Sequence, residues 1–196
     1  MLEREVKLAY PTADAARAAL AAAGAVPMRP RRLEDDSLFD TTDELLRKKG
    51  CLVRVRTDHW SSGATTTLTA KGPVQPGRLK VREEHETRVE SGGALLQVLA
   101  LLELRPTFRY QKYREEFSVP DVVIAIDETP VGTFVEPEGS EDAIVSLTRA
   151  LGRTPADFIL DSYYRLFQNR REQSGLAGPH MLFPSSPRAA ADKPQR

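Results

Sequence analysis

The chain has 196 residues, and its 28 lysines and arginines are balanced by 28 aspartates and glutamates, so the formal net charge is zero. This balance provides no overall field that would attract nucleic acid or an anionic membrane, and any basic site must be a local concentration of charge. Hydrophobic residues make up 40% of the chain and charged residues 29%, which fits a single globular domain with a real core.

Cysteine usage and apolar runs indicate the compartment. The single cysteine, Cys51, excludes an intramolecular disulfide and a cysteine-built zinc site, and it fits a reducing environment. The sequence begins with a charged strand pattern rather than an apolar signal core, and no apolar run approaches membrane-spanning length. We therefore expect a cytoplasmic protein that binds neither nucleic acid nor membrane.

Alternation of apolar and polar residues predicts strands, and capping residues predict helices. In chain order, strands are expected over residues 2–9, 33–40, 51–57, 65–71, 79–89, 108–118, 122–127 and 132–138. Helices are expected over residues 12–23, 41–49 (a turn or short helix), 91–104, 140–151 and from 154 onward. These elements predict one α+β domain over residues 1–173, whereas residues 174–196, dominated by Gly, Pro, Ser and Ala, predict a disordered C-terminal tail.

Charge recurs at every second position in almost every expected strand. Glu3, Glu5 and Lys7 are the first example, because side chains two residues apart in a strand share one face. The corresponding charged positions of the later strands are Arg54, Arg56, Lys71, Arg82, Glu84, Glu86, Lys112, Arg114, Asp127, Glu136 and Glu138. The opposite faces are mostly apolar, so most strands have one ionic and one apolar side.

Two folds explain this pattern. In the first, an antiparallel sheet exposes its charged face to water. In the second, an antiparallel eight-stranded β-barrel forms a tunnel with a polar lumen, and helices pack on the outside. Ordinary solvent-facing positions would mix Ser, Thr, Asn and Gln with the charges, whereas these positions are nearly all Arg, Lys or Glu. Seven cations and seven carboxylates inside a small lumen indicate a site for a polyanion and a divalent metal.

The charged segments resemble the CYTH superfamily, also called triphosphate tunnel metalloenzymes, which includes class IV adenylyl cyclases and the thiamine and inorganic triphosphatases. Its ExExK signature is similar to residues 3–7, its paired arginines to 54–56, its LTxKGP segment to 68–73 and its RxExE strand to 82–86. Its KxR strand is similar to residues 112–114, its acidic strands to 126–138 and its closing helix to Ser162 and Tyr163. Pro137 departs from the pattern, because proline lacks the N–H group that pairs strands.

The resemblance implies a role for each charged residue. The triphosphate-binding cations would be Lys7, Arg54, Arg56, Lys71, Arg82, Lys112 and Arg114, because arginine forks and lysine point charges suit phosphate oxygens. The ligands of Mg²⁺ (or Mn²⁺) would be Glu3, Glu5, Asp127, Glu136 and Glu138, with Glu84 and Glu86 orienting the cations or binding further metal. Lys7 and Asp127 would be catalytic. One hypothesis is that neighbouring cations depress the pKa of Lys7, so that it acts as a base.

The resemblance predicts a Mg-dependent enzyme that cleaves the triphosphate of a small molecule by phosphoryl transfer to water. ATP, thiamine triphosphate and tripolyphosphate are the expected substrates. The alternative is a class IV adenylate cyclase that converts ATP to cyclic AMP and pyrophosphate. A non-catalytic polyphosphate- or nucleotide-binding module is the third reading, and the carboxylates argue against it because a binder gains little from them. The resemblance also implies a homodimer.

Overall fold

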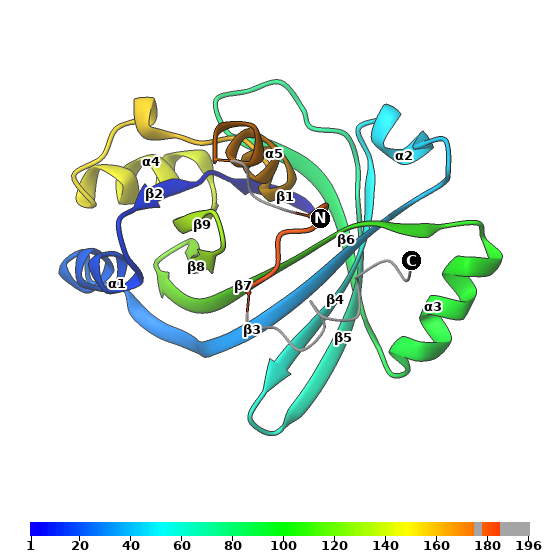
Figure 1. The fold of residues 1–196 in the computed structure, drawn as a ribbon. Helices are drawn as coiled ribbons and strands as arrows, with labels where there is room; N and C mark the ends of the chain where they lie inside the picture. The colour runs from blue at the N-terminus through cyan, green and yellow to red at the C-terminus, as the bar shows by residue number, and fades with distance from the viewer. Residues whose placement is uncertain (175–177, 185–196) are drawn as a thin grey trace.

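The structure is a computed structural model, and it describes residues 1–174 and 178–184. Its strands are β1 (Leu2–Glu5), β2 (Leu8–Tyr10), β3 (Val26–Asp40), β4 (Leu52–Trp60), β5 (Gly63–Lys71), β6 (Lys80–Val89), β7 (Arg105–Val119), β8 (Val122–Thr129) and β9 (Gly132–Gly139). They form one antiparallel sheet in the order β1-β6-β5-β4-β3-β7-β8-β9-β2, and β1 also pairs with β9 (Figure 1). The sheet therefore closes on itself.

Strands β1 and β2 act as one barrel strand with a break in the middle. Strand β1 pairs with β6 on one side, and both β1 and β2 pair with β9 on the other. Between them, Lys7 leaves the sheet and instead forms an isolated antiparallel bridge with Ile159. The described residues thus confirm the predicted α+β fold with a closed antiparallel barrel of eight strands, one of them split in two.

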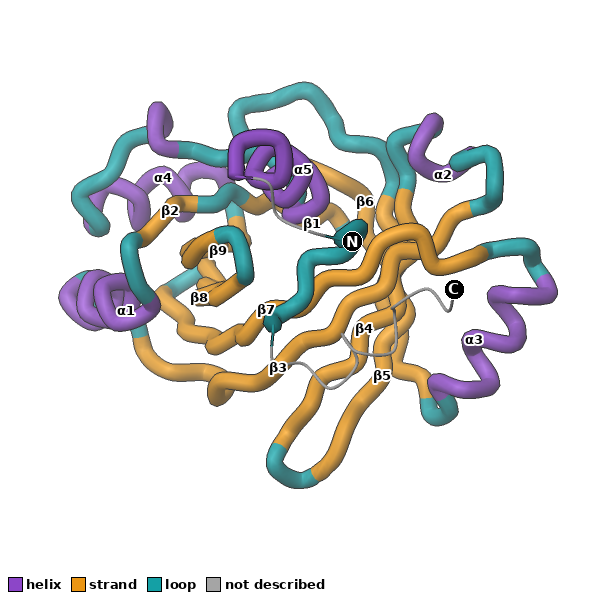
Figure 2. The backbone as a smooth tube through the Cα atoms, viewed as in Figure 1, coloured by secondary structure: helices purple, strands orange, loops and turns teal. Residues whose placement is uncertain are grey.

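The helices are α1 (Ala13–Ala22), α2 (Leu45–Lys48), α3 (Gly92–Leu101), α4 (Glu141–Ala150) and α5 (Tyr163–Ser174), with a 3₁₀ turn at Pro155–Asp157. Figure 2 shows them around the orange sheet, with α1 and α4 on one side and α3 on the opposite side. Caps predicted from sequence are present: Thr12, Ser91 and Ser140 each accept a hydrogen bond from a backbone N–H of the first helical turn. None of the helices in the described residues has the length and apolarity needed to cross a membrane.

The outer apolar faces of the strands pack against the helices. Leu20 of α1 and Leu147 of α4 bury themselves against Leu8, Ile124 and Ile126 in the largest core cluster. Leu99 of α3 packs with Phe39 and Val55 in a separate cluster. The apolar side of the alternating pattern therefore forms the core between barrel and helices, which leaves the ionic side for the lumen.

One end of the barrel interior is apolar. Phe108 and Tyr110 precede Lys112 at two-residue spacing on β7, and Phe134 precedes Glu136 in the same way on β9, so these rings share the inner face. They pack with residues from the C-terminal part of the chain, and we call the whole set the apolar plug: Phe108, Tyr110, Phe134, Tyr163, Phe167 and Met181. Helix α5 thus contributes side chains to the barrel interior, unlike the helices that lie outside.

The structure corrects two predicted boundaries. Strand β3 begins at Val26 rather than at residue 33, and its pairing with β7 shifts register on both sides of Arg29, which lets Pro27 and Pro30 enter the strand. The last helix does not begin at residue 154. Thr154 instead caps the separate 3₁₀ turn, and α5 starts at Tyr163.

The prediction of a disordered tail from residue 174 is wrong for residues 178–184. Met181 forms a parallel bridge with Tyr110, donating its backbone N–H to the Arg109 carbonyl at 3.0 Å and accepting from the Gln111 N–H at 2.9 Å. The Met181 side chain is fully buried, and the Phe183 ring lies 5.1 Å from that of Tyr113. This short segment orders because it covers an edge of β7 that β8 does not reach, as β8 pairs with β7 only from Tyr113 onward. Ser174 is the last residue of α5, and residues 175–177 and 185–196 of the predicted tail lie outside the described residues.

Candidate functional site: an ion-lined tunnel

The barrel encloses a cavity of about 770 Å³. Predicted site residues that line it are Glu3, Glu5, Lys7, Arg54, Arg56, Lys71, Arg82, Glu84, Glu86, Lys112, Arg114, Glu136 and Glu138. Asp127 does not line it and lies fully buried behind Lys112 and Arg114. The period-two pattern therefore does bring cations and carboxylates from strands far apart in sequence into one enclosed space.

The break in the N-terminal strand places Lys7 in the lumen. Its backbone exchanges two hydrogen bonds with Ile159, at 3.0 and 2.9 Å, instead of pairing with β9. Its ammonium lies 3.1 Å from Glu136 and 4.0 Å from Glu5, and the side chain is 2% exposed. Lys7 is therefore a buried cation held by carboxylates of two strands.

The same break explains why Pro137 is tolerated. Its carbonyl accepts a hydrogen bond from Val6 at 3.4 Å, and its nitrogen faces the same neighbouring strand. Pro137 is accommodated here because regular pairing of the N-terminal strand with β9 is interrupted between Glu5 and Leu8. Glu136 and Glu138 keep their places on the cavity wall on either side of the proline.

Four cations of β4 and β7 surround the carboxylates of Glu34 and Asp36 on β3, and Arg32 of β3 itself lies 2.7 Å from Glu34. Arg56 lies 2.9 Å from Asp36 and 3.1 Å from Glu34, while Arg54 lies 3.4 Å from Asp36. Glu34 also lies 3.4 Å from Lys112 and 3.8 Å from Arg114. Glu34 and Asp36 are fully buried, so they hold the guanidinium and ammonium groups of β4 and β7 from the side away from the cavity.

Asp127 organises the opposite part of the wall. Arg114 donates to both oxygens of Asp127 at 2.6 Å, Lys112 donates to Oδ2 at 2.9 Å and the Tyr163 hydroxyl donates to Oδ2 at 2.7 Å. Arg114 also contacts Glu136. Asp127 is thus saturated by hydrogen-bond donors of this chain, and its visible role is to hold the cations of β7 in place.

A second group of acids gathers where β1 meets β5 and β6. The Lys71 ammonium lies 2.7 Å from Glu3 and 2.8 Å from Glu84, and the Lys80 ammonium lies 2.6 Å from Glu5. Arg54 reaches across to the same group, 3.7 Å from Glu84. Here, too, each cation is paired with carboxylates.

Arg82 differs from the other predicted phosphate ligands. Its Nε donates to the carbonyl of Gly72 at 2.7 Å and its Nη2 to that of Gly50 at 2.9 Å. At Gly50, where φ is 70°, a Cβ atom would lie 3.2 Å from the Pro73 side chain, so glycine allows these two loops to meet. Arg82 therefore fastens two loops beside the cavity, and part of its hydrogen-bonding capacity is already used.

The charges perturb one another strongly. Burial, followed by Glu5, raises the pKa of Glu3 to about 7, although Lys71 opposes this. Burial would also raise the pKa of Glu5, but Lys7 and Lys80 lower it to about 2. Burial alone would lower the pKa of Lys7. The carboxylates of Glu136 and Glu5 outweigh this effect of burial and raise the pKa above its ordinary value. The hypothesis that Lys7 has a depressed pKa is therefore wrong for this arrangement of charges.

Several residues of the cavity wall, or buried directly behind it, were missed from the sequence. Arg32, Glu34 and Asp36 alternate on β3 in the same two-residue pattern as the other strands, so the signal was present. Lys80 stands two residues before Arg82 and could have been found in the same way. Tyr163 was matched only to the closing helix of the resemblance, and its place in the cavity wall was not predicted, because it depends on how α5 docks.

The acids suit a metal bound together with phosphate rather than a cage made by the protein alone. Among residues 1–174 and 178–184, no three His, Cys, Asp or Glu side chains converge as a ready-made metal site. Magnesium usually takes only one or two carboxylates and completes its octahedron with water and substrate phosphates. Burial, followed by Glu5 and Glu84, raises the pKa of Glu138, and burial, followed by Glu5, raises that of Glu3. A divalent cation beside these two carboxyl groups would stabilise their charged forms.

The chain was compared with known proteins. A search of curated protein sequences finds no match. Among solved structures, protein PH1819 of Pyrococcus horikoshii OT3 is similar, with a TM-score of 0.73, 23% identity and coverage of 86% of this chain and 99% of that one. A Vibrio parahaemolyticus protein provisionally named an adenylate cyclase has a TM-score of 0.71 and 20% identity, covering 86% and 98%.

A third similar structure is HpAC1 of Hippeastrum, provisionally named an adenylyl cyclase and described as having a dominant triphosphatase activity. It has a TM-score of 0.60 and 17% identity, with coverage of 85% of this chain and 95% of that one. At these identities, the three structures share the fold. The CYTH domain pattern, in contrast, matches the sequence itself over residues 1–153. With its closed barrel and ion-lined lumen, this chain belongs to the CYTH domain family.

Proposed function

We propose that this chain is a divalent-metal-dependent enzyme that hydrolyses the triphosphate of a small molecule inside the barrel. One observation carries the proposal: Arg54, Arg56 and Lys112 are buried, Arg114 is only 15% exposed, and all four line the cavity. Carboxylates hold each of them in place. Buried cations of this number fit an anion carrying several charges. A triphosphate, with roughly four negative charges at neutral pH, is such an anion.

The arginines and lysines would bind the phosphates. Arg56 and Arg54 offer planar forks from β4, and Lys112 and Arg114 come from β7 on the other side of β3. Because these groups are already oriented by Glu34, Asp36 and Asp127, little reorganisation is needed when phosphate charge develops during the reaction. Lys7, which lies beside Glu136, and Lys71, which lies beside Glu3, would also bind phosphate oxygens.

Carboxylates at the other side of the cavity would hold Mg²⁺ or Mn²⁺. Glu3, Glu5, Glu136 and Glu138 are the candidates, with Glu84 beside them. When bound, the metal would neutralise phosphate charge and activate water. Asp127 faces its hydrogen-bond donors in this structure, so we assign it to positioning Lys112 and Arg114 rather than to direct metal binding. Lys7, whose pKa is raised, would act as a phosphate ligand and remain protonated.

Cyclisation of ATP to cyclic AMP is the second candidate function. It is supported by similar structures that carry the name adenylate or adenylyl cyclase, one of which is described as mainly a triphosphatase. Both reactions need the same phosphate cradle and differ in the attacking oxygen, water or the ribose hydroxyl. We favour hydrolysis because the proposed phosphate ligands do not select among the groups that can be attached to the phosphates.

A panel of triphosphates tests the proposal. Tripolyphosphate, thiamine triphosphate and ATP are incubated with the full chain and Mg²⁺, with EDTA as control, and orthophosphate, pyrophosphate and cyclic AMP are measured separately. Metal-dependent orthophosphate release supports hydrolysis, and cyclic AMP with pyrophosphate supports the cyclase. Tight binding without any product would contradict both and favour the non-catalytic binder.

A further inference from the structure

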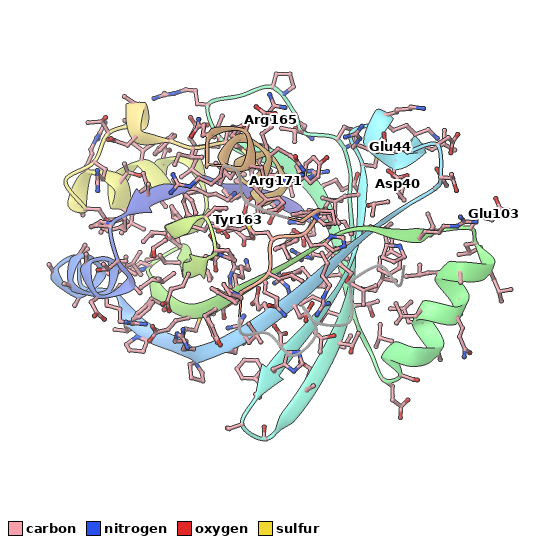
Figure 3. All side chains as sticks on the ribbon, viewed as in Figure 1. Asp40, Glu44, Glu103, Tyr163, Arg165 and Arg171 are labelled. Carbon is pink, nitrogen blue, oxygen red and sulfur yellow. The ribbon has the colours of Figure 1, made fainter. Side chains whose placement is uncertain are left out.

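Tyr163 stands at the boundary between the apolar plug and the ionic part of the lumen. Its ring packs on the plug, with centroids 6.0 Å from Tyr110 and 5.8 Å from Phe134. The residue lines the cavity and is 7% exposed. It lies on α5, beyond residues 1–153 that match the CYTH domain pattern. Figure 3 shows its label beside β9, below α5.

The hydroxyl group of Tyr163 reaches the ionic side. It donates to Asp127 Oδ2 at 2.7 Å, and the same oxygen accepts from Lys112 and Arg114. Burial, together with Asp127 and Glu136, raises the pKa of Tyr163 well above its ordinary value, so the hydroxyl keeps its proton and remains a donor. Three donors, two from β7 and one from α5, therefore meet on one carboxylate oxygen.

The ring of Tyr163 lies near two cavity cations. The Lys7 ammonium is 5.0 Å from the ring centroid and the Lys112 ammonium is 5.2 Å from it. Both lysine side chains are 2% exposed, so the attraction between ammonium and ring is poorly screened by water. Lys7 comes from the N-terminal strand and Lys112 from β7, and the ring links the two.

We propose that Tyr163 is a positioning residue of the triphosphate site, which sets the places of Lys112 and Arg114 through Asp127 and those of Lys7 and Lys112 through its ring. The inference rests on the proposed triphosphate function. It extends the site beyond the strands to α5, so that docking of the C-terminal helix completes the phosphate cradle. The hydroxyl and the ring act on different groups, so substitutions that remove one or both of them can separate their effects.

The test is the binding of a methylene-bridged, non-hydrolysable analogue of tripolyphosphate to the full chain with Mg²⁺, measured by titration calorimetry. Tyr163→Phe removes the hydroxyl and keeps the ring, and Tyr163→Leu removes both. Tyr10→Phe is the matched control, because the buried hydroxyl of Tyr10 has no hydrogen-bond partner among the described residues and packs in the outer core. Each variant is also made in the Asp127→Asn background.

We expect Tyr163→Phe to weaken binding about tenfold, as loss of a hydrogen bond to a charged group would, and Tyr163→Leu to weaken it further. Tyr10→Phe should stay within twofold of the wild type. In the Asp127→Asn background, Tyr163→Phe should change binding less than twofold, because the pathway through Asp127 is already broken. An undiminished tenfold effect in that background would overturn the role assigned to the hydroxyl.

A measurement on the unmutated chain keeps the proposal testable if a variant fails to fold. Ring currents should move the Hε resonances of Lys7 and Lys112 upfield of the other lysines in the proton spectrum. Unshifted resonances would overturn the role of the ring. Failure of the wild type to bind the analogue would instead defeat the proposed function, whereas wild-type binding with Tyr163→Phe equal to Tyr10→Phe would defeat this inference alone.

Discussion

Lys71 donates to both carboxylate oxygens of Glu3 at 2.7 Å, yet the pKa of Glu3 is raised to about 7. The ammonium is shared, because Glu84 lies 2.8 Å from the same nitrogen. Burial and the carboxylates of Glu5 and Glu84 together outweigh the one cation. Burial is the largest of these effects, so the charged form of Glu3 is disfavoured even beside the Lys71 ammonium.

The raised pKa of Glu3 predicts a pH dependence of stability. Between pH 4.5 and about 7 the folded chain holds a proton on Glu3 that the unfolded chain has lost, so this residue makes stability fall as pH rises through that window. Glu3→Gln should therefore raise the free energy of unfolding at pH 8, by up to roughly 3 kcal/mol. Urea titrations at pH 4.5 and 8 measure the difference, with Glu90→Gln as the exposed control. Equal pH slopes in Glu3→Gln and the wild type would refute the raised pKa.

Metal binding should stabilise the fold. Since the lumen acids repel one another, Mg²⁺ bound among them raises the free energy of unfolding by about 2.7 kcal/mol at a hundredfold excess over its Kd. Differential scanning calorimetry should show the melting temperature rising with Mg²⁺ and returning with EDTA. Glu138→Gln should reduce the rise, because it removes one carboxylate of the group, while Glu90→Gln should not. An equal rise in both variants would place the metal elsewhere.

Arg56 should be indispensable to both binding and folding. Arg56→Lys keeps the charge but loses the fork that spans Glu34 and Asp36, and should weaken tripolyphosphate binding about tenfold or more. Arg56→Ala leaves two buried carboxylates short of a partner and should cost about 3–5 kcal/mol of stability. Calorimetric titration and chemical denaturation measure the two effects. Arg165→Ala, exposed on α5 (Figure 3), is the control, and a similar loss there would argue against a specific role.

The ordered segment at residues 178–184 should contribute to stability. Met181→Ala opens a cavity in the apolar plug and should lower the free energy of unfolding by about 2–5 kcal/mol. Met28→Ala, at a side chain that is 44% exposed, should change it by less than about 0.5 kcal/mol. Thermal denaturation of both variants checks this. If Met181→Ala behaves like Met28→Ala, the contacts of this segment do not stabilise the fold.

The sequence alone determined the barrel and most of its lining. Side chains two residues apart share a face of a strand, so Glu3 with Glu5 and Arg54 with Arg56 could be assigned to the lumen without coordinates. The same rule, applied to the strand predicted over residues 33–40, would have found Glu34 and Asp36. Pro27 and Pro30 obscured only the first part of β3, which holds Arg32. Glycine- and proline-rich composition likewise hid the ordered residues around Met181, because composition does not show which strand edge lies open nearby.

Only the tertiary structure decided which charges meet. The partners of Glu34, the sign of the pKa shift of Lys7 and the contact between Tyr163 and Asp127 depend on distances between segments far apart in the chain. Local periodicity fixes the face on which a side chain lies, but barrel closure and helix docking set its height along the tunnel and its neighbours. Electrostatic energies vary steeply with those separations and with burial, so they emerge only when the strands are assembled.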